Sequence, residues 1–156
     1  MRTEQSEDER DEVVELERRI AAPPETVFQF FTDPERYKLW HGVEAELDPR
    51  PGGVFRVLMT TKTRQTARGV YVEIDPPRRV VFTWGFEGID ALPPGTSTVE
   101  VTLEGDGEQT VLRLRHSGLP TPDLCAFHSW GWGFTLDRLE IAAPGGDPGR
   151  YPHADF

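Results

Sequence analysis

Two histidines carry the clearest chemical signal in this sequence. His116 lies near the end of the alternating run "TVLRLRHS", and His128 opens the aromatic run "HSWGWGFTLDRLE". Both fall on the apolar side of the segment that carries them. Because a buried imidazole needs a hydrogen-bond partner, each ring is either bonded within the protein or faces a ligand or water. Two inward histidines from two segments strengthen the case for a ligand pocket, and the structural alternative stays open.

Catalytic and metal-binding patterns around the histidines are incomplete. Cys125 lies three residues before His128, which would place both on one helix face. Without an acid to orient the ring, we expect no nucleophilic pair. Neither a carboxylate nor a third histidine is visibly placed with the two rings, so we expect no metal site. The turns "PGG" and "GDG" lack the lysine of a phosphate loop. The sequence therefore predicts no catalytic residue, no metal and no cofactor, and favours a binding protein over an enzyme.

A long helix over about residues 122–143 would position His128. Its residues within about 40° of one line are Cys125, His128, Trp132, Leu136, Leu139 and Ala143. This side should face a sheet. Gly131 and Gly133 flank Trp132, which indicates a close approach of the helix backbone to a neighbour. The alternative is a flexible point that lets the helix lift to admit a ligand.

The opposite side of the same helix is also apolar. It carries Phe127, Trp130, Phe134 and Ile141, spaced three, four and seven residues apart. Left in water, these side chains would form a patch of the kind that marks an interaction surface. We expect a second copy of the chain to cover them in a homodimer. Two alternatives are a cover made by the C-terminal tail with Tyr151 and Phe156, and a later helix start that leaves Phe127 and Trp130 in a loop.

The sheet that the helix should meet is predicted over residues 43–117. Runs of five to nine residues alternate between apolar and polar, and turn sequences such as "DPPR", "LPPG" and "GDGE" separate most of them. The residues placed on the inner side are Val70, Val72, Ile74, Phe82, Trp84, Val99, Val101, Leu103, Leu112, Leu114 and His116. The other side is polar, as in many antiparallel sheets.

The N-terminal part adds a strand and two short helices. The run "VVELERRI" over residues 13–20 alternates like a half-buried strand, with Arg18 as a charged exception on the inner side. Pro23 and Pro24 suit the start of a helix that contains Phe30 and Phe31. The sequence "TDP" ends this helix, and a second one should run through Tyr37 and Trp40.

Length and composition limit the class of protein. The 156 residues favour one domain, and 17 basic against 27 acidic residues give a net charge of −10. This charge argues against nucleic acid and anionic membranes as partners. The chain shows no run of about 20 apolar residues and no signal-peptide core. We expect a cytoplasmic protein with a disordered acidic tail over residues 1–11, a domain over 12–145 and an irregular tail over 146–156.

The order of these segments predicts an α+β fold in which a curved antiparallel sheet wraps around a long C-terminal helix. In the order of these segments and in several motifs, the chain resembles the START-like, helix-grip proteins grouped as SRPBCC. It is most similar to the group named after the activator of the heat-shock-protein-90 ATPase. The segments that carry the resemblance are "APPETVFQFFTDPERYKLW", "PRPGGVFRVLM", "ARGVYVEIDPPRRVVFTWGFEG", and "HSGLP" followed by "HSWGWGFTLDRL".

The resemblance implies an apolar cavity between the C-terminal helix and the concave side of the sheet. The predicted function is therefore non-enzymatic binding of a small, largely apolar molecule. The expected ligand-binding residues are Phe55, Val57, Met59, Tyr71, Phe82, Trp84, Leu114, His116, His128, Trp132 and Leu136. Two alternatives stay open. One is stimulation of a heat-shock ATPase through the domain surface, with a chaperone as partner. The other is a cavity enzyme such as a cyclase or hydrolase.

Overall fold

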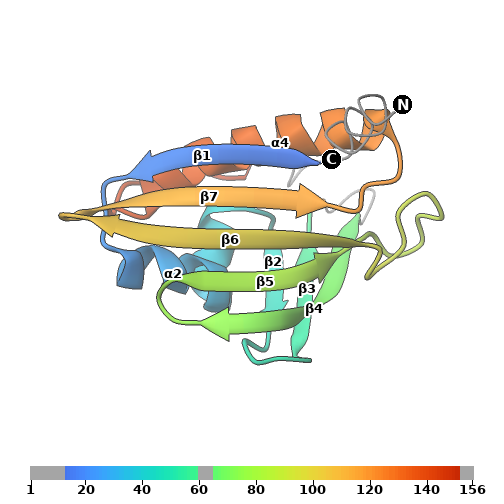
Figure 1. Cartoon of the computed structure of the whole chain (residues 1–156), viewed down its shortest axis with the longest axis horizontal. Helices are drawn as coiled ribbons and strands as arrows, with labels where there is room; N and C mark the ends of the chain where they lie inside the picture. The colour runs from blue at the N-terminus through green and yellow to red at the C-terminus, as the bar shows by residue number, and fades with distance from the viewer. Residues whose placement is uncertain (1–12, 60–64, 152–156) are drawn as a thin grey trace, which may run out of the picture.

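Seven antiparallel strands form one curved sheet in the computed structural model of the chain, which describes residues 13–59 and 65–151 (Figure 1). The strand order across the sheet is β1-β7-β6-β5-β4-β3-β2. The strands are β1 (Val14–Ile20), β2 (Glu44–Leu47), β3 (Val54–Leu58), β4 (Thr66–Asp75), β5 (Arg79–Trp84), β6 (Ser97–Asp106) and β7 (Gln109–Ser117). The predicted disordered segment over residues 1–11 and Phe156 of the tail lie outside the described residues.

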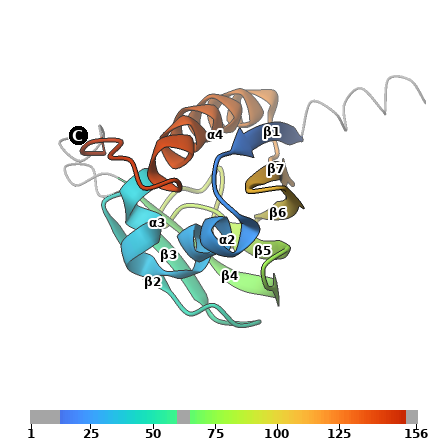
Figure 2. The same ribbon diagram turned by 90° about the vertical axis from the view of Figure 1, so that its left-hand side faces the viewer.

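Three helices complete the described part of the chain. Helices α2 (Pro24–Thr32) and α3 (Pro34–Trp40) follow β1, and α4 (Pro122–Ala142) follows β7. The carboxylate of Asp33 caps α3, and the hydroxyl of Thr121 caps α4. Figure 2 shows α4 lying across the open side of the curved sheet, with α2 and α3 at one end. The predicted helix-grip fold is confirmed, and the described helices include none long and apolar enough to span a membrane.

The helix and strand boundaries agree with most of the sequence prediction. Helix α4 covers Pro122–Ala142 against the predicted 122–143, so the alternative in which it begins after Trp130 is wrong. Strand β2 was not predicted, because it has only four residues, two of them glutamate. The inner sides of β5, β6 and β7 are as predicted. The residues buried there include Phe82, Trp84, Val99, Val101, Leu103, Leu112, Leu114 and His116.

The predicted inner side of β4 is wrong in its first half. Val70 and Val72 are 42% and 50% exposed, whereas Tyr71 between them is fully buried. The pairing with β5 shifts register between Tyr71 and Glu73. Such a bulge adds one residue to one strand and reverses the alternation beyond it. Ile74 therefore packs against the core as expected, while the two valines point to the other face.

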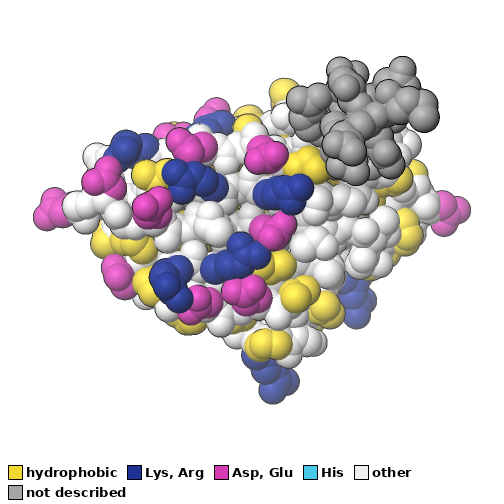
Figure 3. Space-filling view, in the orientation of Figure 1, with side chains coloured by type: hydrophobic (Ala, Val, Ile, Leu, Met, Phe, Trp, Pro, Cys, Tyr) yellow, Lys and Arg dark blue, Asp and Glu magenta, His cyan; other side chains and the backbone are white. Residues whose placement is uncertain are grey.

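Arg18, the charged exception on β1, connects the sheet to α4. Its guanidinium pairs with Asp137 and, at 2.9 Å, with Glu140, and it donates to the carbonyl oxygen of Gly133 at 3.3 Å. Basic and acidic side chains lie among one another on the outer face of the sheet (Figure 3), and several of them form ion pairs. Arg79 pairs there with Glu100 at 2.8 Å. Ion pairs at the surface of a protein typically contribute little stability each.

Candidate functional site

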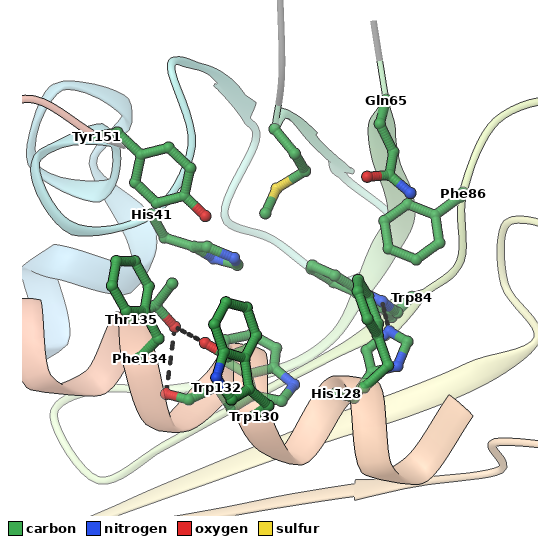
Figure 4. A pocket seen from close by; sticks show the side chains of 13 residues that line it. His41, Gln65, Trp84, Phe86, His128, Trp130, Trp132, Phe134, Thr135 and Tyr151 are labelled. Carbon is green, nitrogen blue, oxygen red and sulfur yellow. Dashed lines mark hydrogen bonds between the residues drawn. The ribbon is translucent and has the colours of Figure 1, made fainter. Parts of the chain in front are cut away.

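A cavity of about 270 Å³ lies between α4 and residues at the ends of β3, β4 and β5 (Figure 4). Its lining is mostly apolar and aromatic, namely Met59, Trp84, Phe86, Phe127, Trp130, Gly131, Trp132 and Phe134. Its polar lining residues are His41, Gln65, His128, Thr135 and Tyr151. Ligand sites are typically apolar clefts with a few polar groups, although most are larger than this one.

Four of the eleven predicted ligand-binding residues line this pocket: Met59, Trp84, His128 and Trp132. The other seven do not line it. They lie in the packed interior, and they are Phe55, Val57, Tyr71, Phe82, Leu114, His116 and Leu136. Aromatic rings fill the space there. Phe55 stacks on Phe82 with 4.1 Å between ring centroids, and Tyr71 packs edge-on against both. The cavity is therefore confined to one end of the space that the sequence suggested.

His128 is bonded through both ring nitrogens. The indole of Trp84 donates to its Nε2 at 3.1 Å. Because an indole N–H can only donate, the proton of the neutral ring lies on Nδ1. Nδ1 in turn donates to the carbonyl oxygen of Leu124 at 2.8 Å. The side chain thus connects a pocket wall on the sheet to the first turns of α4.

His116 is bonded in the same way. The indole of Trp132 donates to its Nδ1 at 3.0 Å, so the proton of the neutral ring lies on Nε2. Nε2 donates to the Ser97 hydroxyl at 2.8 Å, and that hydroxyl donates to the carbonyl oxygen of Trp84 at 2.9 Å. The two imidazoles therefore accept from the two indoles, which both line the pocket and lie with their ring centroids 5.3 Å apart.

This network favours the structural interpretation of both histidines. Burial lowers the pKa of His128, and burial together with the neighbouring His128 lowers the pKa of His116 well below its usual value. Adding a proton would also remove the acceptor of an indole N–H. Both rings are therefore held neutral and bonded, which makes them poor acids or bases for a cavity enzyme. Among residues 13–59 and 65–151, no group of three histidine, cysteine or carboxylate side chains could hold a metal.

Three of the four expected interface residues also belong to the pocket, so they do not form a surface separate from it. Phe127, Trp130 and Phe134 all line the pocket, and the rings of Trp130 and Phe134 stack at 5.8 Å. Phe127 and Trp130 are also 52% and 61% exposed, and Ile141 farther along α4 is 48% exposed. The first three residues therefore form the outer wall of the cavity and part of the molecular surface at once.

The two glycines of α4 do not make the close backbone contacts that the sequence suggested. A Cβ atom on Gly131 would have no atom of the described neighbouring segments within 4 Å, and Gly131 lines the pocket. A Cβ atom on Gly133 would lie 3.6 Å from the Arg18 guanidinium, which is an ordinary contact. The predicted crowding is therefore wrong for both positions, and at Gly131 the missing side chain leaves room that belongs to the cavity.

Sequence reasoning missed five lining residues, namely His41, Gln65, Phe86, Thr135 and Tyr151. The ring of His41 is nearly parallel to that of Trp84, with centroids 5.9 Å apart. The spacing of four residues from Tyr37 was a usable signal, because the Tyr37 hydroxyl lies 2.7 Å from His41 Nδ1. Tyr151 was expected only as part of a possible tail cover over the helix, and not as a pocket residue.

Comparisons with known proteins agree with this fold. A family model described as "Activator of Hsp90 ATPase homolog 1-like protein" matches residues 21–143. The structure of an AHSA1-like protein from Rhizobium etli is 42% identical, with a TM-score of 0.70 over 92% of this chain and 89% of that chain. CalU16 from Micromonospora echinospora is 31% identical, with a TM-score of 0.71 over 88% of this chain and 68% of that chain.

A third similar structure is an HSP90 activator from Plasmodium falciparum. It is 26% identical, with a TM-score of 0.68 over 83% of this chain and 94% of that chain. A comparison with curated protein sequences gives no match. The family model covers most of the chain, and the resemblance stated from the sequence is confirmed. The chain therefore belongs to the family of Activator of Hsp90 ATPase homolog 1-like proteins.

Proposed function

We propose that this protein binds a small, largely apolar ligand in the pocket between α4 and the sheet. The observation that carries the proposal is the cavity of about 270 Å³ beside a closely packed aromatic core. Small-molecule sites are typically concave and lined mostly by apolar and aromatic side chains, as this pocket is. Its volume fits a small molecule better than a long lipid chain.

The pocket walls support this proposal because they are held in place. The indoles of Trp84 and Trp132 are fixed by hydrogen bonds to His128 and His116. Side chains that are ordered before binding lose little entropy on binding, which favours affinity for an apolar ligand. The histidines thus act on the ligand through the tryptophans that they orient.

Filling the cavity from Gly131 tests the proposal. A Cβ atom at this position would have no atom of the described neighbouring segments within 4 Å, so a leucine should fit there and fill part of the pocket, and it would also favour the helix over glycine. The wild type should bind the uncharged apolar dye N-phenyl-1-naphthylamine saturably at one site. Gly131→Leu should weaken binding at least about tenfold, which corresponds to about 1.4 kcal/mol.

The matched control is Gly133→Ala, which changes the other α4 glycine at a position with ordinary contacts. It should leave dye affinity unchanged. The proposal is wrong if the wild type shows no saturable binding, or if the leucine variant is folded and binds as tightly as the wild type. If the dye results support the pocket, native mass spectrometry of protein purified from its own host would identify the natural ligand.

A second candidate function is stimulation of a heat-shock ATPase. The observation that favours it is the family itself, together with the similarity to a structure described as an HSP90 activator. The test is ATP turnover by a heat-shock-protein-90 chaperone with and without this protein. A ligand carrier should leave turnover unchanged, whereas a co-chaperone should raise it in both the wild type and Gly131→Leu.

A further inference from the structure

The chain turns sharply at the end of α4. The N–H groups of Gly145 and Gly146 donate to the carbonyl oxygens of Ala142 and Ile141 at 3.0 and 2.9 Å. Gly145 has a φ of +107°, a conformation that favours glycine. A Cβ atom on Gly146 would lie 2.7 Å from the Ile141 carbonyl oxygen, so a larger residue would not fit without a shift. The glycine-rich sequence after α4 therefore makes a defined turn, which sends residues 146–151 back toward the pocket.

Arg138 on α4 holds this returning segment against the end of α3. One of its Nη atoms donates to the carbonyl oxygens of Gly149 and Leu39 at 2.8 and 3.1 Å. The other Nη donates to the carbonyl oxygen of Pro148 at 3.0 Å, and Nε donates to that of Trp40 at 3.2 Å. The residue is only 7% exposed. A guanidinium can bind both segments at once because its five N–H donors lie in one rigid plane.

The returning segment brings the ring of Tyr151 to the pocket. Tyr151 is 7% exposed and belongs to the pocket lining. Its ring lies over the guanidinium of Arg138, 5.3 Å from the central carbon, and meets the His41 ring edge-on at 6.3 Å. Figure 4 shows Tyr151 and His41 at one end of the pocket, and Phe86 and His128 at the other. The phenol ring is therefore the wall of the pocket at the end beside α3.

We propose that Tyr151 limits the length of the ligand that the pocket accepts, and that Arg138 is the positioning residue that holds this ring in place. The role of Tyr151 depends on the volume of its ring and not on its hydroxyl. The ligand class is then a compact apolar molecule that ends at this ring. The proposal rests on the proposed function, because it assumes that the pocket takes a ligand. It adds a limit on ligand length and the residue that enforces it.

Truncation of the ring tests the length limit. Displacement of N-phenyl-1-naphthylamine measures the affinity of the 1-alkanols from 1-hexanol to 1-dodecanol. In the wild type, affinity should rise with each methylene until the chain reaches the Tyr151 ring, and should then level off. Tyr151→Ala adds the volume of the ring to the pocket, so affinity should rise over about two further methylenes, by about tenfold in total. The matched control Tyr151→Phe keeps the ring and should level off at the wild-type length.

Arg138→Met tests the positioning role. It keeps much of the apolar stem of the side chain and removes all of its hydrogen-bond donors. The length limit should move to longer alkanols, as in Tyr151→Ala, and amide hydrogen exchange in residues 146–151 should become faster while the core strands stay protected. A side chain that only stabilised the fold would leave the length limit unchanged. Arg78→Met, an exposed arginine paired with Asp75, is the matched control and should change neither readout.

The outcomes separate this proposal from the one on which it rests. If the wild type binds the dye but shows no length limit, or if Tyr151→Ala keeps the wild-type limit, the end wall is wrong and the apolar pocket stands. If the wild type binds neither the dye nor any alkanol, both proposals are wrong.

A folded Arg138→Met variant that keeps the wild-type limit would overturn the positioning role. If this variant does not fold, Arg138→Lys decides the question, because one ammonium cannot reach four carbonyls in two directions. The lysine variant should then accept longer alkanols than the wild type, and a folded lysine variant with the wild-type limit would also overturn the role.

Discussion

The imidazoles of His116 on β7 and His128 on α4 meet edge to face, with ring centroids 4.9 Å apart. Each ring accepts a hydrogen bond from a tryptophan. Each ring also donates a hydrogen bond, His116 to the Ser97 hydroxyl and His128 to the carbonyl oxygen of Leu124. The pair therefore joins the sheet, the long helix and two pocket walls in one neutral network.

The first prediction is that the protein loses stability in mild acid. Burial lowers the pKa of both histidines, so the folded state binds fewer protons than the unfolded state below the unfolded pKa of about 6.5. The free energy of unfolding should be highest above pH 6.5 and should fall as the pH drops from there toward the lowered folded pKa values. Urea unfolding between pH 8 and pH 5 measures this. Titration of both imidazoles by NMR with ordinary pKa values would contradict it.

The second prediction concerns the indole of Trp132. Trp132→Phe keeps an aromatic ring but leaves His116 Nδ1 without its donor in the protein interior. An unsatisfied buried acceptor costs about 1–3 kcal/mol, and the smaller ring adds a cavity cost. The free energy of unfolding should therefore fall by at least this amount. The control is Trp130→Phe at a 61% exposed position, which should change stability by less than about 0.5 kcal/mol. Equal effects of the two substitutions would show that the indole bond is unimportant.

The third prediction tests the two faces of β4. Tyr71 donates from its buried hydroxyl to the carbonyl oxygen of Phe31 at 2.8 Å. Tyr71→Phe should lower the free energy of unfolding by about 1–2 kcal/mol, because the carbonyl loses a buried partner. Val72→Thr, at a 50% exposed position next to it, should cost less than about 0.5 kcal/mol. A larger loss from the valine substitution would mean that the register shift after Tyr71 is misplaced.

The fourth prediction is that the protein forms a homodimer through the exposed side of α4. Trp130 stacks on Phe134, and Phe127 and Trp130 remain more than half exposed. Trp130→Glu together with Phe134→Glu should give a folded monomer in sedimentation velocity. Ile89→Glu, at a 42% exposed apolar position elsewhere, should leave the dimer intact. A wild type that is monomeric at high concentration would exclude the dimer. Deleting residues 145–156 then tests the tail as the alternative cover.

Local sequence patterns were enough to predict all the helices, every strand except β2, and most of the buried faces. The spacing of Cys125, His128, Trp132 and Leu136 predicted a helix with almost the observed bounds. This was possible because the period of a helix can be seen within one continuous segment of the sequence. Alternation fixed the inner sides of β5, β6 and β7 for the same reason. It failed on β4, because a bulge changes the alternation without changing the types of residue.

The position of the pocket and the polar groups that line it could not be predicted without the folded structure. Phe55 and Phe82 have the apolar character of pocket walls, but they stack on each other and leave no space. His41 and Tyr151 are far apart in sequence and meet because Arg138 binds the backbone before each of them. Local periodicity shows which side of an element is buried. The position of a cavity depends instead on how side-chain volumes from distant segments fill the interior, and no single segment of the sequence contains that information.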